Sequence, residues 1–489
     1  MQPFQPIRPE CNSQMSTIVE QLANFTFDTD YEQLPAEVAE ESKRLLVDSV
    51  GCALAGLSHP KGTIGVDYAR LQGPGAPGEQ ATILGAGGRV SATAAAFANG
   101  ELINALDFDA ILPPGHVSPY VIPCAMAAAE TSGASGRALL AAIAIAHEIS
   151  NRIGKSLDYL RDIKDGKAAP PPVNGFSSTV FGAAAGAGKL RGHSAEQLAN
   201  ALGIAGSMSP VNTQWAWSVH VPTATVKYGL AGAVTDAAMA ATYLSELGHT
   251  GDLQMLDCGE HGYRRLIGSQ RWAPENITPM LGDKWFFPNE QSYKPYPHCR
   301  ILHAPLDVLT RILEVNDIRP EEIESITAWV EEWVLKPLWT RREISHVTQA
   351  QFSIAHGLAL GAHRIPPGKA WQSPEVVFNP SVLALVPKVN YEVHPDYASR
   401  LAANPASRPA RIQVRARGQV FDGETLFPKG SPSPDPQTRM TNDEISQKYI
   451  RNAQGVLAPE AIEQSLEAMW SLDRFDNIDG LMSLLTRRS

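Results

Sequence analysis

Two carboxylates and a histidine lie close together in the stretch from Asn104 to Ser118, which reads NALDFDAILPPGHVS. Asp107 and Asp109 follow a run of small residues typical of a tightly packed helix, and the Pro-Pro-Gly sequence before His116 must end that helix in a loop. A partly buried carboxylate and an imidazole can shift each other's pKa toward neutrality, which is the property that a general acid or base needs. The alternative interpretation is structural: Asp107 caps a helix, and His116 is a polar group whose hydrogen bonds are satisfied.

A second candidate is the cationic segment from Lys294 to Arg300, which reads KPYPHCR. Its two prolines stiffen the backbone, so the two cations lose little entropy when they are ordered. Arginine binds carboxylates through two parallel hydrogen bonds, and lysine acts as a point charge. Such a loop in a net acidic protein favours an anionic ligand. The alternative is a rigid linker between domains with solvated charges.

Hydroxyl groups gather at Ser177, Ser178 and Thr179, at the predicted start of another helix. Hydroxyls at this position usually cap the helix. The same position also presents free N–H groups and the positive end of the helix dipole, which suit a carboxylate. Further along, a Trp-rich segment carries His220 and Lys227 between two predicted helices.

The composition of the 489 residues favours a helical protein of two domains, because a single core stops growing at this length. Ala and Gly are abundant and aromatic residues make up only 7%, which suits helices packed through small residues. The net charge of −10 and the pI near 5.7 argue against a general nucleic-acid or anionic-membrane binder. An anionic substrate therefore needs a local positive site.

The cysteines and the amino-terminal stretch favour an intracellular protein. The five cysteines show neither a C-x-x-C pair nor zinc-ligand spacing, so reduced thiols in the cytoplasm are expected and no metal is assigned. The stretch MQPFQPIRPECNSQMS lacks an apolar core of signal-peptide length and is expected to be a short disordered leader. No apolar run reaches the roughly 18 residues of a membrane span.

Periodic apolar spacing predicts the elements that must position these residues. The predicted helices are Pro35–Leu57, Ser91–Ala105, Val121–Thr131, Ser135–Ile153, a helix opening at Ser177, Ser194–Gly206, Thr225–Leu247 and several after Thr441. His147 lies in the middle of one of them and is predicted to be a core histidine. After Gly251 the pattern changes: Ile318–Val334 predicts a helical turn followed by a strand, and Ala410–Phe421 alternates as a half-buried strand does. These two stretches predict an inserted α+β region.

Several motifs in a specific order resemble the MmgE/PrpD family over nearly the whole chain. They are LPAEVAEESKRLLVDSVGCALAG, ALDFD with a following His, EISNRIG, SELGHTG, KPYPHCR, QAQFSIAH and FPKGSPSPDPQTRMTNDEISQKY. The resemblance implies a mainly α fold, in which a large helical domain from both chain ends (17–288 and 438–489) carries an inserted α+β lid domain (289–437). It also implies a homodimer that uses neither a metal nor an organic cofactor.

The resemblance implies roles for residues at matching positions. Asp107 and His116 match the family's aspartate and following histidine, and one or the other would move a proton. Lys294 matches the lysine of the K-P-Y-P-x-C segment, and would bind or polarise a substrate carboxylate. The predicted substrate-binding residues are Asp109, Ser177, Ser178, His220, Lys227, Tyr296 and Arg300. The chain departs from decarboxylase-like members in having Ser177 where they have His, and WSVHVP where they have a cation; His220 and Lys227 are candidates to replace those groups.

The predicted function is that of a cofactor-independent lyase or isomerase that transfers a proton α to a carboxylate. Its predicted substrate is di- or tricarboxylate-like, or a bulkier carboxylic acid. Family members of this kind include 2-methylcitrate dehydratase, cis-aconitate decarboxylase and iminodisuccinate epimerase. The expected partner is a small carboxylate substrate, with neither nucleic acid nor membrane. One alternative is an epimerase of an imino- or amino-dicarboxylate. A second, of another class, is an inactive homologue that only binds a metabolite.

Overall fold

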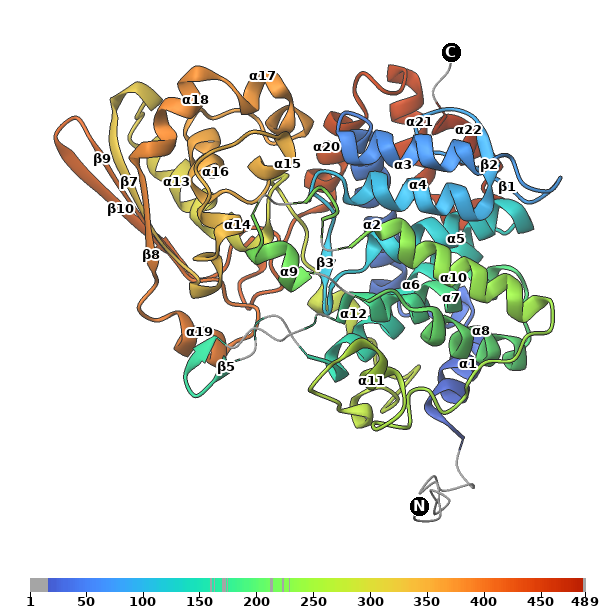
Figure 1. The fold of residues 1–489 in the computed structure, drawn as a ribbon. Helices are drawn as coiled ribbons and strands as arrows, with labels where there is room; N and C mark the ends of the chain where they lie inside the picture. Colours follow the sequence, from blue (N-terminus) through green and yellow to red (C-terminus); the bar gives the residue numbers. More distant parts are fainter. Residues whose placement is uncertain are drawn as a thin grey trace.

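The computed structural model describes residues 16–158, 161, 163–168, 173, 175–211, 214–221, 224–227 and 229–486. A helical body and an α+β body lie side by side (Figure 1). The predicted leader with Cys11 and part of the Trp-rich segment lie outside the described residues. Among the described residues, none of the helices combines the length and the apolar character needed to cross a bilayer.

The helical body is built from both ends of the chain. Its longer helices are α1 (Ile18–Asp28), α2 (Ala36–Gly56), α3 (Pro60–Leu71), α4 (Ala92–Asn104), α5 (Ser118–Ser132), α6 (Gly136–Ser156), α7 (Thr179–Leu190), α8 (Ala195–Met208), α10 (Ala231–Glu246), α20 (Asn442–Ala453) and α21 (Pro459–Trp470). Shorter ones are α9 (Gln214–Val219), α11 (Tyr263–Ile267), α12 (Phe287–Glu290) and α22 (Asp479–Leu484). Helix α20 lies beside α2, so the carboxyl-terminal segment returns to the first long helix (Figure 1).

Small residues let these helices approach closely, as the composition predicts. A Cβ added to Gly182 of α7 would overlap the backbone of Ala146 in α6, and one added to Gly56 of α2 would overlap Leu102 of α4. Predicted helix ends are also found: α20 begins with a capping box between Thr441 and Glu444. This close packing makes the helical body a rigid support for the loops at its edge.

The α+β body is built around a four-stranded sheet in the order β10-β9-β7-β8. The strands are β7 (Ile323–Val330), β8 (Val389–Val393), β9 (Ala410–Ala416) and β10 (Gln419–Thr425). Strand β7 pairs parallel to β8 and antiparallel to β9. The accompanying helices are α13 (His303–Val315), α14 (Pro337–Thr340), α15 (Val347–Ala350), α16 (Ile354–Ala362), α17 (Pro374–Val377), α18 (Pro380–Leu385) and α19 (Tyr397–Ala403). The mainly α fold with a smaller α+β portion is therefore confirmed.

Apolar burial separates the two bodies. The larger hydrophobic cluster takes residues from Ile18 to Tyr293 and again from Met440 to Leu485. A second cluster takes residues from Tyr296 to Ala416, together with Phe176 and Trp217. The boundaries at 288/289 and 437/438 stay a prediction.

Three local predictions were wrong. Ala410–Phe421 is not one strand: β9 and β10 form a hairpin, because Arg417 (φ 54°) and Gly418 (φ 68°) make a two-residue turn that does not interrupt the alternation. The helix predicted from Thr225 begins at Ala231, so Lys227 precedes it. Ser177 and Ser178 belong to a 3-10 turn, η2 (Gly175–Ser178), rather than to the first turn of α7.

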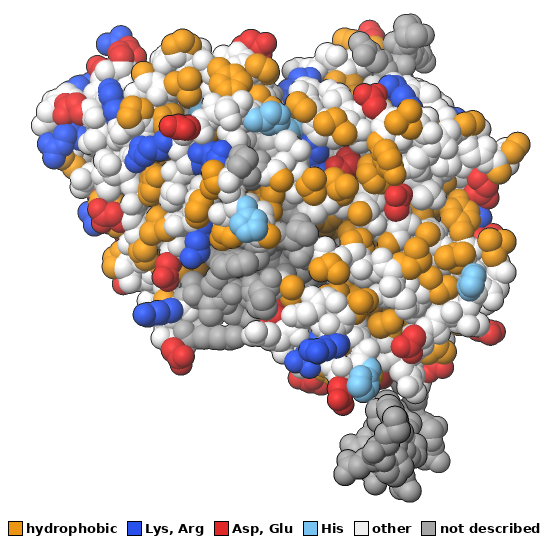
Figure 2. Space-filling model, viewed as in Figure 1, with side chains coloured by type: hydrophobic (Ala, Val, Ile, Leu, Met, Phe, Trp, Pro, Cys, Tyr) orange, Lys and Arg blue, Asp and Glu red, His pale blue; other side chains and the backbone are white. Residues whose placement is uncertain are grey.

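The visible face of the molecule carries charges of both signs. Lys and Arg side chains are interspersed with Asp and Glu across it, and apolar side chains are scattered between them (Figure 2). Among the described residues of this face, neither sign of charge gathers into a continuous stripe (Figure 2).

Candidate active site

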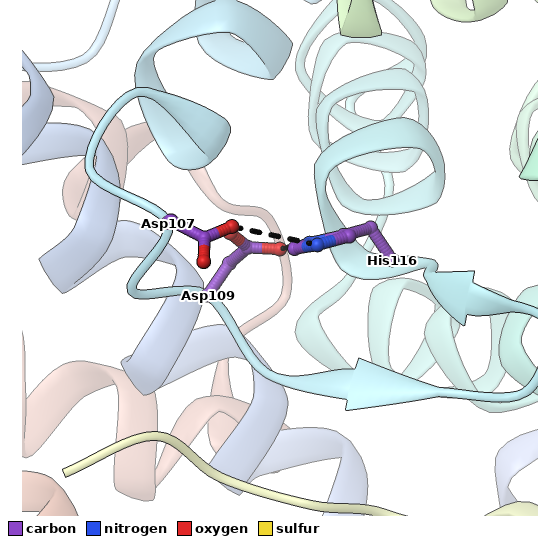
Figure 3. A group of neighbouring side chains, drawn as sticks. All are labelled: Asp107, Asp109 and His116. Atoms are coloured by element: carbon purple, nitrogen blue, oxygen red, sulfur yellow. Dashed lines mark hydrogen bonds and ion pairs between the residues drawn. The ribbon is translucent and has the colours of Figure 1, made fainter. Parts of the chain in front are cut away.

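A short hairpin presents the histidine to the two carboxylates. Helix α4 ends at Asn104, and the chain then passes through Asp107 and Asp109 into β3 (Ile111–Leu112) and β4 (Gly115–His116). The strands pair antiparallel, with Ile111 opposite His116. Asp107 adopts the left-handed conformation with φ 52°, and the Pro113–Pro114 peptide bond is cis. The two carboxylates and the imidazole point toward one another (Figure 3).

Asp109 fixes the orientation of His116. Its Oδ2 lies 2.5 Å from Nδ1 of the imidazole, and its Oδ1 lies 3.5 Å from the amide nitrogen of Asn104. Phe176 meets the imidazole edge-on, with ring centroids 5.9 Å apart. The other ring nitrogen, Nε2, lies 3.6 Å from Oδ1 of Asp107 (Figure 3). The imidazole is therefore held at one nitrogen and directed at Asp107 with the other.

Two lysines from distant parts of the chain meet at Asp107. Nζ of Lys227 lies 2.9 Å from Oδ1, and Nζ of Lys294 lies 3.0 Å from Oδ2. Lys294 also donates to the Asp107 carbonyl at 2.9 Å, and Lys227 donates to the Asn104 carbonyl at 2.8 Å. All three charged side chains are buried, with exposed fractions of 0 to 1%. The site thus concentrates charge where water has little access.

Burial and charge oppose each other in setting the protonation of these groups. Burial alone would raise the pKa of Asp107, but Lys227, Lys294 and His116 hold it well below its ordinary value. Burial would also raise the pKa of Asp109, but His116 holds it below its ordinary value. Burial lowers the pKa of Lys227 to about 8, although Asp107 and Asp109 act in the other direction. The two carboxylates, Asp107 and Asp109, and the two ammonium groups, Lys227 and Lys294, balance one another in charge when all four are ionised.

The same residues have donor atoms of a kind that binds metal ions. Ligand atoms of Asp107, Asp109 and His116 lie within 4.8 Å of one another. However, each carboxylate oxygen of Asp107 already faces a lysine ammonium group within 3.0 Å. A divalent cation bound there would be repelled by two positive charges at short range. The arrangement suits proton transfer and an anionic ligand better than a divalent cation.

Comparison with known proteins identifies the group of proteins to which this site belongs. The sequence model of the MmgE/PrpD N-terminal domain matches residues 20–275, and that of the MmgE/PrpD C-terminal domain matches residues 296–473. The chain belongs to the MmgE/PrpD family. The resemblance read from the motifs is therefore confirmed.

Curated relatives of this MmgE/PrpD protein are similar over almost their whole length. The cis-aconitate decarboxylase-like protein oryM of Aspergillus oryzae is 24% identical, over 96% of this chain and 97% of the relative. The cis-aconitate decarboxylase of Mus musculus is 24% identical, over 96% of this chain and 94% of the relative. The cis-aconitate decarboxylase of Homo sapiens is 23% identical, over 96% and 95%. These relatives support a decarboxylase-like role at the level of the family.

Among the site residues predicted from the sequence, five lie together in the structure: Asp107, Asp109, His116, Lys227 and Lys294. Asp107 caps no described helix, since it follows the end of α4, so that part of the structural alternative is wrong. The core role predicted for His147 is confirmed, because its Nδ1 lies 2.8 Å from the Ile143 carbonyl.

The hydroxyls near α7 do not cap the helix in the expected way. Ser178 donates to the carbonyl of Gly175 at 2.5 Å, and Thr179 donates to that of Phe176 at 2.7 Å. A cap would instead accept from a backbone N–H. Ser177 is buried directly after Phe176, the residue that packs on His116. Substrate binding by Ser177 and Ser178 stays a prediction.

Three other predicted residues point elsewhere. His220 is exposed after the end of α9. The Tyr296 hydroxyl donates to Asp307 at 2.9 Å. The Arg300 guanidinium donates to the Lys429 carbonyl and to Ser431, each at 2.7 Å, so it fastens the 429–431 loop rather than joining Lys294. The two cations of this segment therefore have different partners: Lys294 contacts Asp107, and Arg300 contacts the 429–431 loop.

Sequence reasoning missed several residues that hold the Asp107 loop from outside. They are Asp48, Gln351, Gln372 and Lys448, which are all buried. Three of them lie in or beside motifs used for the family resemblance, but a buried Gln in a sequence does not reveal which backbone carbonyl it will contact. Only the tertiary structure pairs them with the loop.

A cavity of about 670 Å³ is bounded by the β3–β4 turn, including Pro113, Pro114 and Gly115. Its basic lining residues are Arg152, Lys155, Arg161, Arg271 and Arg408. Most of these charges are balanced: Lys155 lies 2.6 Å from Glu290, and Arg161 lies 2.9 Å from Glu331. The cavity therefore borders the hairpin that carries His116, while its cations largely serve the structure around it.

Proposed function

We propose that this protein is a lyase that transfers a proton at the carbon next to a carboxylate of a small di- or tricarboxylate. The observation that carries the proposal is the convergence of Lys227 and Lys294 on Asp107, with Nε2 of His116 3.6 Å from the same carboxylate. The decarboxylase-like relatives support the same class of reaction.

His116 is the proposed proton carrier. If Nδ1 donates its proton to Asp109, the neutral imidazole keeps its lone pair at Nε2, where it can accept a proton from carbon. Asp109 then stabilises the imidazolium that forms and keeps the ring oriented. Oδ2 of Asp109 lies 2.5 Å from Nδ1 of His116, so a positioning role fits Asp109 better than direct substrate binding.

Lys294 is the proposed partner of the substrate carboxylate. Two of its three N–H donors are directed at the carbonyl and the carboxylate of Asp107. The ammonium group has three N–H donors in all, and in this proposal the third binds the incoming anion. When the carbon loses its proton, negative charge moves onto that carboxylate, and a nearby ammonium group in a dry site stabilises it.

Both lyase outcomes share this proton transfer. In decarboxylation, the electron pair of the broken C–C bond stays on the substrate carbon, CO₂ leaves, and His116 supplies a proton to that carbon. In dehydration, the proton passes from carbon to His116 and the electron pair of the C–H bond forms the C=C bond. The C–O bond breaks, and the imidazolium returns the proton to the departing hydroxide, which leaves as water. The cluster provides the same groups for either direction.

Epimerisation is a second candidate, and the lowered pKa of Lys227 favours it. An epimerase needs a second group that can carry a proton near neutral pH, and Lys227 has a pKa of about 8. Its Nζ lies 2.9 Å from the same Asp107 oxygen that faces His116. In that case Lys227 would return the proton to the opposite face of the carbon.

The proposal is tested by incubating the protein in D₂O with a panel of di- and tricarboxylates, and following deuterium uptake, CO₂ release and product chirality. We expect uptake with at least one acid, a loss of about 10²- to 10⁴-fold in His116→Gln, and retained activity in His261→Gln. His261 is a suitable control because its side chain is 64% exposed. Unchanged exchange in both His116→Gln and Lys294→Met would overturn the proposal. Inverted product without loss of CO₂ or water would select the epimerase.

A further inference from the structure

Five successive backbone carbonyls in the loop that carries Asp107 each accept a hydrogen bond from a distant side chain. The bonds run from Lys227 to Asn104 at 2.8 Å, Gln351 to Ala105 at 2.8 Å, Gln372 to Leu106 at 2.7 Å, Lys294 to Asp107 at 2.9 Å and Lys448 to Phe108 at 2.6 Å. We call these five donors the carbonyl clamp. They come from five separate segments of the chain.

The carbonyl clamp supplies hydrogen-bond donors to carbonyls at the end of α4. The last carbonyls of a helix have no partner within the helix, and here they are buried away from water. Asp107 adds a left-handed backbone conformation (φ 52°), which persists in a non-glycine residue when its surroundings hold it. The donors therefore determine where the Asp107 carboxylate points.

The donors Gln351 and Gln372 lie well inside the α+β body. Gln351 directly follows α15, and Gln372 ends the 3-10 helix η7 (Lys369–Gln372). The Gln351 amide donates to Oε1 of Gln372 at 2.7 Å, so the two side chains act as a pair. Nε2 of Gln372 also donates to the Pro297 carbonyl at 2.8 Å. One amide thus joins the Asp107 loop to the segment that carries Lys294.

The same segment of the α+β body also faces the second lysine. Phe352 follows Gln351 in the chain, and its ring lies 5.8 Å from Nζ of Lys227. Movement of this segment would shift the surroundings of Asp107, Lys294 and Lys227 together.

We propose that Gln351 and Gln372 are positioning residues, through which the α+β body sets the geometry of the Asp107, Lys227 and Lys294 cluster. This inference rests on the proposed function. Neither glutamine contacts His116 or a reacting atom; each acts through the backbone carbonyls of Ala105 and Leu106. Without the pair, those carbonyls would be buried without a donor, and the loop would relax away from its lysines.

Gln372→Glu gives a sharp test, because it keeps the shape and the Oε1 acceptor used by Gln351 but removes both donor bonds. Gln349→Glu is the matched control: Gln349 is also buried, and its Oε1 accepts from Ser345 within the α+β body. We expect kcat for deuterium exchange to fall about 10- to 100-fold in Gln372→Glu, with KM nearly unchanged and a shifted alkaline limb of the pH profile. Gln349→Glu should keep the wild-type kcat and pH profile.

Two further measurements separate positioning from general stability. Backbone amides of residues 104–110 should exchange faster in Gln372→Glu and at the wild-type rate in Gln349→Glu. The double variant Gln351→Leu with Gln372→Leu should lose no more activity than either single variant, since the pair acts as a unit. A wild-type protein that exchanges no acid would overturn the proposed function. If the wild-type protein is active, and Gln372→Glu keeps both the wild-type kcat and the wild-type amide protection of residues 104–110, the positioning role alone would be overturned.

Discussion

Oδ2 of Asp109 lies 2.5 Å from Nδ1 of His116, so this carboxylate determines which ring nitrogen is available for chemistry. Asp109→Asn keeps the shape but allows the amide to donate to Nδ1, which favours the tautomer with its proton on Nε2. We expect kcat to fall about 10²- to 10⁴-fold with little change in KM, measured by deuterium exchange. Asp422→Asn is the control, because Asp422 forms an exposed pair with Arg411. Equal rates in Asp109→Asn and wild type would remove His116 from the reaction.

Lys227 should impose an alkaline limit on activity. Burial lowers its pKa to about 8, so its ammonium group loses a proton as the pH rises through that value. Asp107 then keeps only one of its two lysine cations, and the cluster becomes net negative toward an anionic substrate. The rate of deuterium exchange should decline above about pH 8, and Lys227→Arg should move that limb upward because a guanidinium stays charged. If the rate of Lys227→Arg declines at the same pH as that of wild type, another group causes the decline.

Raising the pH should increase the contribution of Lys227 to stability, although it lowers activity. Its pKa in the folded protein, about 8, lies below the ordinary value of 10.5. Between these values the unfolded chain binds more protons than the folded protein, so the contribution of Lys227 to the free energy of unfolding increases with rising pH. Urea unfolding of wild type and Lys227→Met at pH 7 and pH 10 checks this: the wild type should gain stability relative to the variant as the pH rises. A relative loss would contradict the sign.

The sequence predicts the helical part well, because apolar periodicity and caps are local properties. The predicted helix Pro35–Leu57 is found as α2, and the predicted cap at Thr441 is found at α20. The hairpin at Arg417 and Gly418 was missed because a two-residue turn preserves the alternation of the strands around it. Helix starts after Pro- and Trp-rich segments were also misplaced, since no clear cap marks Ala231.

The site was predictable only where charge and motif order coincide. Asp107, His116 and Lys294 meet as expected, and so does Lys227, which the sequence offered only as a replacement candidate. Arg300 was grouped with Lys294 because they share a stiff segment, yet backbone stiffness does not determine side-chain direction. The carbonyl clamp was not predictable, because it pairs glutamines with carbonyls more than 240 residues away in the chain.

Gly115→Ala should damage both stability and activity. A Cβ at this position would overlap the ring of Phe176, which packs on His116, and the backbone there has φ 156°. We expect a loss of about 1–3 kcal/mol in unfolding free energy, and slower deuterium exchange. Phe176→Leu in the same chain should recover part of the stability. Gly78→Ala is the control, because Gly78 also has positive φ (86°) but open space around it. Equal losses in the two Gly→Ala variants would assign the effect to backbone strain instead of the Phe176 contact.

The buried ion pair of Lys448 and Asp48 should be costly to break. Nζ of Lys448 lies 2.7 Å from Oδ1 of Asp48 and 2.6 Å from the Phe108 carbonyl, with both side chains almost fully buried. Lys448→Met leaves a buried carboxylate and a buried carbonyl without this donor, so we expect a loss of about 3–5 kcal/mol in urea unfolding. Because burial raises the pKa of Asp48, the carboxyl in this variant should take up a proton on folding, and the loss should shrink as the pH falls.

The control for this pair is Lys43→Met, since Lys43 pairs with Asp473 where both side chains are partly exposed. An exposed pair of this kind contributes about 0–1 kcal/mol, so the control should unfold close to wild type. Adding Asp48→Asn to Lys448→Met removes the unpaired charge and should restore part of the stability, because most of the cost comes from the carboxylate left behind. Equal losses in Lys448→Met and Lys43→Met would show that water reaches Asp48 in solution, and the anchor at Phe108 would then be too weak to hold Asp107 and Asp109 on either side of it.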